Sequence, residues 1–380
     1  MIYLNNAATS WPKPESVLKA VSDCLANPPS DWNRGTGDKS GDILSECRTR
    51  AARFFGIGDP VRLVFTSGGT HSLNLAIRGL NLDGAHVVTT VTEHNSVIRP
   101  LKHLERDRHV RLTFVKCSSD GTIDPGDVIS AMHTDTCLVA VSHMSNVTGA
   151  VQDLAAIGEE TRQRGIPFLV DASQSAGHVP IDVEAMKIDL LAFTGHKGLR
   201  GLPGTGGLYI REGIPLEPLM TGGTGVKSES LHQPEELPLY YEAGTLNLPG
   251  IAGLNEGLKL LEDGAMERDE ARTAELTRRL TGGLAGIPGI HLIGGRGGIL
   301  SFTLDGHDPE ETGYLLSEMY GISVRTGLHC APLIHEHIGT SPRGTVRVSP
   351  SDRNTEAEMD AFVEAVGKIA GKYKSRLFGE

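Results

Sequence analysis

Short apolar runs alternate with turn residues and helical stretches between about residue 60 and residue 210. Seven of these runs have the length and composition of strands, and most are apolar on both faces: 61–66, 85–91, 110–115, 137–142, 167–171, 188–193 and 206–210. A strand that is apolar on both faces belongs in a sheet that helices cover from both sides. Helical patterns such as residues 154–165 lie between the runs. This alternation predicts an α/β fold with a mainly parallel seven-stranded sheet.

The pattern changes near residue 250, where longer helical segments begin. Residues 251–264 and 267–284 have helical patterns, and strand patterns follow them. The length of 380 residues exceeds the size at which a single core stops growing. We therefore expect a large α/β domain over residues 13–250, and a smaller α+β domain formed by residues 1–12 and 251–380.

Composition and charge narrow the classes of function. The net charge of −11 argues against nucleic acid as the main partner. The sequence contains no apolar run of about 18 residues, so we expect no membrane span. The first fifteen residues carry neither the basic nor the apolar part of a secretory signal. The five cysteines are scattered and form no C-x-x-C pair, so we expect reduced thiols in a cytoplasmic protein, without a metal site.

Two charged residues follow predicted strands. Asp171 ends one strand, and Lys197 comes just after a later one. Parallel sheets bind ligands outside the carboxyl ends of their strands, so both side chains should point into one crevice. Pyridoxal phosphate (PLP) needs a lysine for its Schiff base and an acidic residue at its ring nitrogen. An isolated lysine after a strand is most often a surface residue, but its pairing with Asp171 favours a PLP site.

Two further motifs lie beside the same expected crevice. "TSGGT" (66–70) is a glycine-rich turn before a helix, where backbone N–H groups and Thr70 suit a phosphate. It lacks the G-K-[ST] of a P-loop, and residues 201–208 lack the glycine order of a dinucleotide site. "TEHNS" (92–96) places His94 where its ring can stack on the cofactor. The alternative for His94 is an ordinary histidine in a polar loop.

The order and spacing of the motifs resemble those of the class V aminotransferase fold, and within it the cysteine desulfurase and selenocysteine lyase group (group II, SufS-like). The resemblance covers nearly the whole chain and rests on these motifs: "YLNNAATSWPKP", "TEHNS", "SHMSNVTG", "VDASQSAGH", "TGHKG", "YEAGTLN", "VRTGLHC" and "TVRVSPSDRNT". It implies PLP-dependent transferase fold type I, PLP as the cofactor, and a homodimer.

The resemblance also implies a role for each matching residue. Lys197 carries the cofactor, Asp171 pairs with the ring nitrogen, and His94 stacks on the ring. The other implied cofactor contacts are Gln174 and Asn146 near the ring hydroxyl, and Gly69, Thr70, Thr194, His196 and a second subunit's Thr245 at the phosphate. The implied substrate contacts are Arg347, which would bind the carboxylate in a bidentate pair, together with Arg325, Asn146, Asn6 and Ala7.

Cys330 lies in "RTGLHCAPL" (325–333), a segment that looks like a loop. In the family reaction Lys197 removes the α-proton of L-cysteine. The Cys330 thiolate then attacks the substrate sulfur, leaving a persulfide and L-alanine. Only a thiolate is an effective nucleophile, and His329 or a group near the cofactor is the candidate for removing its proton. Pro332 limits the segment, so we expect a guarded persulfide; the alternative is a small packing residue in a turn.

The other cysteines and a histidine-rich stretch are given ordinary roles. We interpret Cys24, Cys47, Cys117 and Cys137 as packing residues, with Cys137 opening a buried strand. "LIHEHIG" (333–339) has an H-x-H spacing, but without cysteine or carboxylate partners this is a weak metal motif. We interpret it as a solvated polar loop.

Four places depart from the family pattern. Asn5 stands where an aspartate is frequent, and Gly69 replaces a common threonine. Asn33-Arg34 replaces a His-Arg pair, and Leu328 replaces one of two histidines before the cysteine. The last two lie near the substrate side, so they bear on substrate and partner more than on cofactor.

The predicted activity is desulfuration of L-cysteine, with transfer of the persulfide sulfur to a protein acceptor. A selenocysteine lyase acting on L-selenocysteine, or a C–S lyase releasing sulfide, uses the same lysine and arginine. Another PLP reaction is a further alternative, since fold does not fix function. A scaffold without activity is disfavoured by the joint presence of Lys197, Asp171, His94, Arg347 and Cys330. The acceptor stays open between an iron–sulfur scaffold, a tRNA or cofactor thiolation enzyme, and a selenium pathway.

Overall fold

The structure is a computed structural model that describes residues 1–27 and 42–378, with side chains described as far as residue 371. The departure at Asn33-Arg34 lies outside the described residues. Within the described ranges, no helix is long and apolar enough to cross a membrane.

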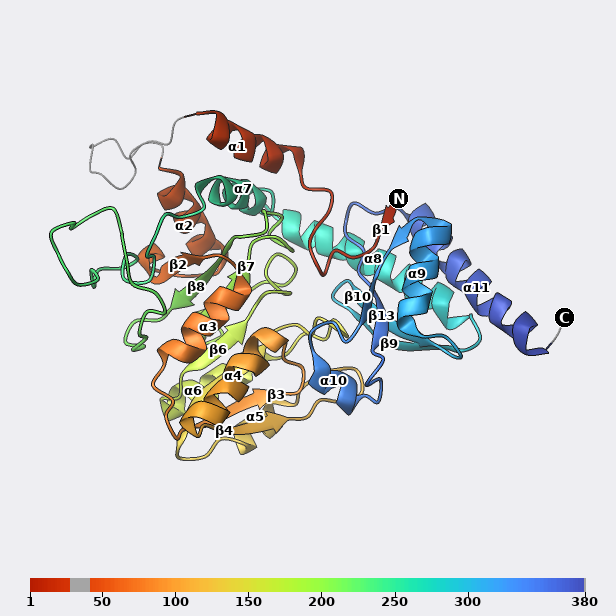
Figure 1. Cartoon of the computed structure of the whole chain (residues 1–380), viewed down its shortest axis with the longest axis horizontal. Helices are drawn as coiled ribbons and strands as arrows, with labels where there is room; N and C mark the ends of the chain where they lie inside the picture. Colours follow the sequence, from red (N-terminus) through yellow and green to blue (C-terminus); the bar gives the residue numbers. More distant parts are fainter. Residues whose placement is uncertain (28–41, 379–380) are drawn as a thin grey trace.

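A seven-stranded sheet forms the centre of the larger part of the molecule (Figure 1). Its strands are β2 (Leu63–Thr66), β3 (His86–Thr90), β4 (Arg111–Val115), β5 (Thr136–Ser142), β6 (Phe168–Asp171), β7 (Leu190–Thr194) and β8 (Gly206–Ile210). Their order across the sheet is β2-β8-β7-β6-β5-β3-β4. Among these seven strands, β8 alone runs in the direction opposite to the others. The predicted α/β fold with a mainly parallel sheet is confirmed.

Both faces of this sheet are buried. Neighbouring residues such as Leu190 and Leu191 point to opposite sides and enter two separate apolar cores. One core is closed by α3 (Gly69–Gly79) and α4 (Asn95–Arg108). The other core is closed by α2 (Ile43–Phe54), α5 (Pro125–Ser130), α6 (Leu154–Arg164) and α7 (Leu248–Lys259). Helix α1 (Glu15–Ala26) packs on α7, and a short 3-10 turn η1 (Pro60–Arg62) precedes β2. The double burial explains why the strand runs are apolar on both faces.

A second sheet lies beside the first, in the order β12-β13-β10-β9. Its strands are β9 (Ile290–Arg296), β10 (Ile299–Leu304), β12 (Arg325–Gly327) and β13 (Thr345–Val348), all antiparallel. Helices α8 (Ala265–Ala285), α9 (Pro309–Tyr320) and α11 (Glu356–Phe378) share its apolar core. The N-terminal strand β1 (Ile2–Tyr3) pairs with β11 (Ile322–Ser323), so the chain start lies beside the C-terminal part (Figure 1). The division of the chain near residue 250 stays a prediction.

Two interpretations of the sequence are wrong. The stretch 333–339 is not a solvated loop, because Pro332–His337 form helix α10, whose Ile334 and His335 are fully buried. A proline at the first helical position suits a helix start, and a helix of six residues is too short to show a periodic pattern. Cys137 is exposed at the start of β5, so it is not a packing residue. Cys47 and Cys117 are buried, as expected.

Candidate active site

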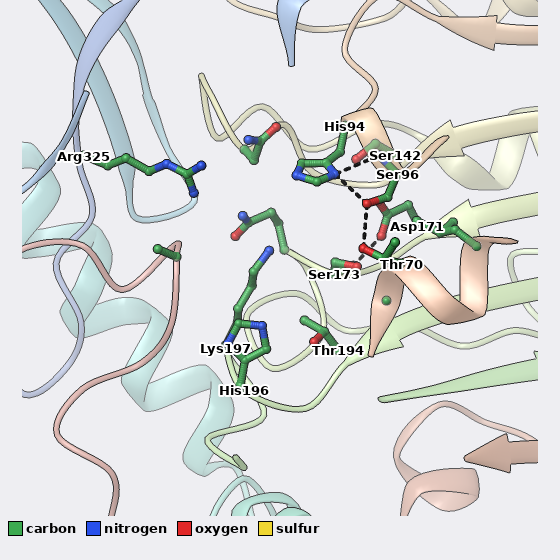
Figure 2. A pocket seen from close by; sticks show the side chains of 15 residues that line it. Thr70, His94, Ser96, Ser142, Asp171, Ser173, Thr194, His196, Lys197 and Arg325 are labelled. Carbon is green, nitrogen blue, oxygen red and sulfur yellow. Dashed lines mark hydrogen bonds between the residues drawn. The ribbon is translucent and has the colours of Figure 1, made fainter. Parts of the chain in front are cut away.

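The carboxyl ends of β3, β5, β6 and β7 face a cavity of about 230 Å³ (Figure 2). Strand β4 lies on one side of β3 and the following strand β5 on the other, so the sheet order reverses between β3 and β5. Parallel sheets bind ligands at such a reversal. The predicted residues that line the cavity are Gly69, Thr70, His94, Asn146, Asp171, Gln174, Thr194, His196, Lys197 and Arg325.

Lys197 follows β7 and extends its amine into this cavity (Figure 2). The amine has no hydrogen-bond or ion-pair partner within the described chain. The pKa of Lys197 is lowered to about 8, mainly by burial; the charge of Asp171 opposes this shift, and the charges of Arg347 and Arg325 add to it. A lowered pKa leaves more of the amine neutral near pH 7, and a neutral amine is the form that attacks an aldehyde.

Asp171 is the last residue of β6, and this position sets its side chain at the carboxyl end of the strand. Its Oδ1 accepts a hydrogen bond from the Ser173 backbone N–H at 2.9 Å. The β5–β6 register sets Asp171 opposite Ser142, which also lines the cavity. The side chain is nearly buried, at 5% exposure, and its charge acts on Lys197. A carboxylate so placed can keep a ring nitrogen protonated.

His94 caps the N-terminus of α4 and faces the cavity (Figure 2). Its Nδ1 accepts a hydrogen bond from the Ser96 N–H at 3.0 Å and lies 2.9 Å from the Ser96 Oγ. Burial lowers the pKa of His94 to about 4, so the ring is neutral at pH 7. The Ser96 Oγ also lies 2.8 Å from the Thr70 Oγ1. Ser96 therefore joins the His94 ring to the glycine-rich turn at residues 66–70.

The turn at residues 66–70, which was predicted to suit a phosphate, is built around two glycines. Gly68 has a φ of +143°, which few other residues adopt, and α3 begins at Gly69. A Cβ on Gly69 would lie 2.5 Å from the Ser173 Oγ. The departure from threonine at Gly69 thus has a physical reason, since Ser173 occupies the space that a side chain would need.

His196 offers a further group for an anion. Its Nδ1 is buried and has no hydrogen-bond partner in the described residues. Burial lowers the pKa of His196 to about 4, and the charges of Lys197 and Lys13 act in the same direction. A neutral imidazole can donate one N–H to an anion. Together with Thr70, Thr194 and the N-terminus of α3, it forms a set of donors suited to a phosphate.

Gln174 and Asn146 line the cavity but bind the backbone. The Gln174 Nε2 donates to the Ala7 carbonyl at 3.0 Å, and the Asn146 Nδ2 donates to the His329 carbonyl at 2.6 Å. Asn6 bonds through its Nδ2 to the Ser349 carbonyl. Several predicted site residues lie outside the cavity lining: Asn6, Ala7, Thr245, Cys330 and Arg347. Thr245 is exposed in the single chain.

Arg347 is fully buried, with 0% exposure. Its Nη1 donates to the Asn146 carbonyl at 2.8 Å, and its Nη2 donates to the Asn5 Oδ1 at 3.3 Å. Its Nε has no hydrogen-bond partner, and no carboxylate of the described residues lies within ion-pair distance. Burial lowers the pKa of Arg347 to about 9. A buried cation without a counter-charge is costly, so the site is suited to an anionic ligand. Asn5 preserves this, because an aspartate there would neutralise the guanidinium.

Cys330 sits on a strained segment between β12 and α10. His329 and Cys330 both have left-handed backbones, with φ of 50° and 62°, which is unfavourable for residues with a Cβ. The backbone is held by the Asn146 bond to the His329 carbonyl and by the Asn95 N–H, which donates to the Cys330 carbonyl at 2.7 Å. The Arg325 Nη2 donates to the Cys330 Sγ at 3.3 Å. The segment is thus anchored to the large sheet's side of the site.

The suggestion that His329 removes the thiol proton is not supported. Its Nε2 bonds to the Thr345 Oγ1 at 2.8 Å, and the ring is buried. Burial lowers the pKa of His329 to about 2, with the charge of Arg347 acting in the same direction. A ring of such low basicity cannot take a proton from a thiol at neutral pH.

The sequence reasoning missed several lining residues. Ala8, Leu73, Ser96, Ser142 and Ser173 line the cavity in addition to the predicted ones. Ser142 and Ser173 come at or just after the ends of β5 and β6, so a polar residue at a strand's carboxyl end was the available signal. Ser96 had no comparable signal, because its role depends on the distance to Thr70.

Comparisons with known proteins identify the family of the chain. The family model described as Aminotransferase class-V matches residues 2–362. A probable cysteine desulfurase of Methanothermobacter thermautotrophicus is 35% identical, over 97% of this chain and 95% of that protein. The cysteine desulfurase IscS of Salmonella typhi is 32% identical, over 98% of this chain and 93% of that protein.

Solved structures give the same result. The apo structure of a cysteine desulfurase from Thermococcus onnurineus NA1 has a TM-score of 0.90 at 32% identity, covering 98% of this chain and 95% of that chain. The S-sulfonic acid form of cysteine desulfurase CsdA from Escherichia coli has a TM-score of 0.88 at 28% identity, covering 96% and 94%.

Members of this family use pyridoxal phosphate, and the site fits that group. Lys197 offers an amine that no described residue binds, and Asp171 offers a carboxylate across the cavity. The unpartnered His196 Nδ1 and the side-chain-free turn at Gly69 suit its phosphate. The fold, the site and the match over residues 2–362 agree: the chain belongs to the class V aminotransferase family.

Proposed function

We propose that the protein is a PLP-dependent cysteine desulfurase that converts L-cysteine to L-alanine and keeps the sulfur as a persulfide on Cys330. The relatives named above support the reaction. The observation that carries the role of Cys330 is the Arg325 guanidinium, 3.3 Å from its sulfur, on a segment whose charges act on Lys197. A thiol beside a cation is the reactive kind.

Four residues of the chain take part in the proposed reaction with bound PLP. Bound PLP supplies an electron sink that weakens the bond between the substrate Cα and its hydrogen. The Lys197 amine takes that proton, and Arg347 holds the substrate carboxylate through its guanidinium. His94 packs on the ring as a neutral imidazole. The Cys330 thiolate attacks the substrate sulfur, so an S–S bond forms while the Cβ–S bond breaks, and protonation of the remaining carbon gives alanine.

The anchored segment supports a guarded persulfide. Two backbone carbonyls, those of His329 and Cys330, are bonded to Asn146 and Asn95 on the side of the large sheet. Ala331 and Ile334 are buried in the core of that sheet. The persulfide would therefore stay beside Arg325, next to the cavity, and a protein acceptor would have to reach it there. This short segment also favours the group II subtype, which stays a prediction.

The assembly and the alternative substrate belong to the same proposal. We expect a homodimer in which the partner's copy of the exposed Thr245 segment completes the phosphate site. L-selenocysteine would bind through the same Lys197 and Arg347. When a reductant in solution converts the released selenium to selenide, cleavage of L-selenocysteine to alanine needs no protein thiol, so we expect Cys330→Ser to separate the two activities.

An alanine assay tests the proposed function. Wild type and Cys330→Ser are incubated with L-cysteine or L-selenocysteine, with and without a reductant, and alanine, pyruvate, sulfide and selenide are measured. We expect alanine from L-cysteine in wild type, and loss of this product in Cys330→Ser with the bound cofactor retained. Pyruvate as the main product, or undiminished alanine in Cys330→Ser, would contradict the proposal.

A further inference from the structure

One backbone oxygen at the site has an unusual number of donors. The His196 carbonyl accepts hydrogen bonds from the Ser10 N–H at 3.0 Å, the Thr9 Oγ1 at 3.0 Å, the Ser10 Oγ at 3.3 Å and the Lys13 Nζ at 2.9 Å. A carbonyl oxygen has two lone pairs, so four donors share one acceptor. This carbonyl belongs to the peptide bond that joins His196 to Lys197.

Lys13 is the charged member of this group. Its Nζ donates to the Ser10 Oγ at 2.9 Å as well as to the His196 carbonyl. In the part of the chain that the structure describes, no carboxylate lies within ion-pair distance of it. Burial lowers the pKa of Lys13 to about 8. A lysine on an ordinary solvated face extends into water or pairs with an acid, whereas Lys13 turns inward to a backbone oxygen.

The segment that carries Lys13 is fixed at its other end too. Asn6 bonds to the Ser349 carbonyl through its N–H and its Nδ2, at 3.1 and 3.0 Å. The Asn6 Oδ1 accepts from the Trp11 N–H, and the Tyr3 hydroxyl donates to the Thr9 carbonyl. Ser349 follows β13, the strand of Arg347. Hydrogen bonds therefore fix the segment at both ends. One end is bonded to Ser349, next to the strand of Arg347, and the other is bonded to the peptide that joins His196 to Lys197.

We propose that Lys13 is a positioning residue for Lys197, holding the His196 carbonyl and so fixing the backbone from which the Lys197 side chain reaches the cavity. The inference rests on the proposed attachment of PLP to Lys197, and not on the sulfur chemistry. Reactions of a bound group depend on its placement, and a displacement of about 1 Å can slow a step by about a hundredfold. Releasing the carbonyl should therefore slow attachment of the aldehyde to the amine.

Two other roles for Lys13 make different predictions. A cation that acts only on the cofactor phosphate would matter for PLP but not for pyridoxal, which lacks the phosphate. A residue that only stabilises the fold would lower the unfolding temperature and leave the attachment rate unchanged. A residue that positions Lys197 affects PLP and pyridoxal alike, because both attach through the same aldehyde.

The test measures attachment to the full-length apo protein. PLP or pyridoxal is mixed with wild type, Lys13→Met, Lys13→Arg and the control Lys19→Met, an exposed lysine that pairs with Asp23 on α1. The rate is read from the visible absorbance and from borohydride trapping on the Lys197 peptide. We expect Lys13→Met to slow the attachment of both aldehydes by about tenfold or more. Lys13→Arg should recover most of the attachment rate, and Lys19→Met should match wild type.

Thr9→Val provides a second variant should Lys13→Met fail to fold, because it removes another donor from the same oxygen with little change of shape. Thr9→Val should also slow the attachment of both aldehydes. Wild-type rates in Lys13→Met and Thr9→Val, or slowing confined to PLP, would overturn the inference. Absence of trapping at Lys197 in wild type would overturn the proposed function as well, so the two failures are distinguishable.

Discussion

The Arg325 Nη2 donates a hydrogen bond to the Cys330 Sγ at 3.3 Å, across a turn of the chain that joins β12 to α10. Within the described residues this guanidinium has no carboxylate partner. Its charge is therefore available to the sulfur and to the cavity into which it points (Figure 2). A cation beside a thiol stabilises the thiolate, which is the attacking form.

Arg325→Leu should make Cys330 less reactive. We expect alkylation of Cys330 by iodoacetamide at pH 7 to slow by about tenfold or more, because the variant loses the guanidinium that donates to the sulfur, and a hydrogen bond to a charged group contributes about 1.5–3 kcal/mol. Arg325→Lys should retain part of the rate. Peptide mass spectrometry reads the reaction, and the exposed Cys137 in the same sample is the reference. An unchanged ratio of Cys330 to Cys137 labelling would show that the guanidinium does not act on the thiol.

Arg347→Met should weaken use of L-cysteine without unfolding the protein. The variant removes a buried cation that lacks a counter-charge, so the free energy of unfolding should not fall much. It also removes the proposed bidentate partner of the substrate carboxylate, and kcat/KM should drop by about a hundredfold or more. Steady-state kinetics measure this, with the exposed Arg343→Met as the matched control. Equal kcat/KM in both variants would remove Arg347 from the substrate site.

Glu93 predicts how stability depends on pH. It is fully buried, its Oε1 accepts from the Thr90 hydroxyl and the Ser142 N–H, and burial raises the pKa of Glu93 to about 8. The folded protein thus holds this proton more tightly than the unfolded chain, whose carboxyl has an ordinary pKa of 4.5. The group's contribution to stability is complete below that pH and is lost as the pH rises towards about 8. The loss is at most about 1.4 kcal/mol per pH unit.

Glu93→Gln lacks this titration. Compared with wild type, the apo variant should therefore gain in unfolding temperature as the pH rises from 5.5 to 8, values that lie on the span set by about 4.5 and about 8. Thermal unfolding followed by circular dichroism measures both proteins at each pH. A difference between them that stays constant with pH would mean that Glu93 is charged in the folded state.

The contact between Gly69 and Ser173 predicts a compensating pair. Gly69→Ala should weaken PLP binding by roughly tenfold, because its Cβ would lie 2.5 Å from the Ser173 Oγ and overpacking costs about 1–3 kcal/mol. Ser173→Ala removes that oxygen, and the next atom, the Ser173 Cβ, is 3.6 Å away. PLP titration should show Gly69→Ala/Ser173→Ala binding more tightly than Gly69→Ala. Additive losses in the double variant would rule the clash out.

Much of the fold and part of the site follow from local pattern. Strands that are buried on both faces are apolar throughout, so the seven runs from 61–66 to 206–210 were predictable from the sequence, whereas their order across the sheet was not. Parallel strands have their carboxyl ends at one edge of the sheet. The sequence alone therefore predicted that Asp171, Lys197 and His94 lie close together. The proximity of these three residues follows from the topology of the sheet alone.

The remaining features depend on distances that no local pattern contains. Ser96 matters because its hydroxyl lies between His94 and Thr70, and a serine after a histidine carries no such signal. Helix α10 has only six residues, and its burial comes from contact with the large sheet's core. The Arg325 bond to Cys330 needs a left-handed turn between them.

The most direct test of the account is the state of Cys330 after turnover. Wild type is mixed with L-cysteine without a reductant, and the Cys330 peptide is analysed by mass spectrometry alongside alanine. We predict one added sulfur atom on Cys330 that dithiothreitol removes, with one alanine formed per persulfide. Alanine formed with the added sulfur on another cysteine, or with no sulfur on the protein, would contradict the account.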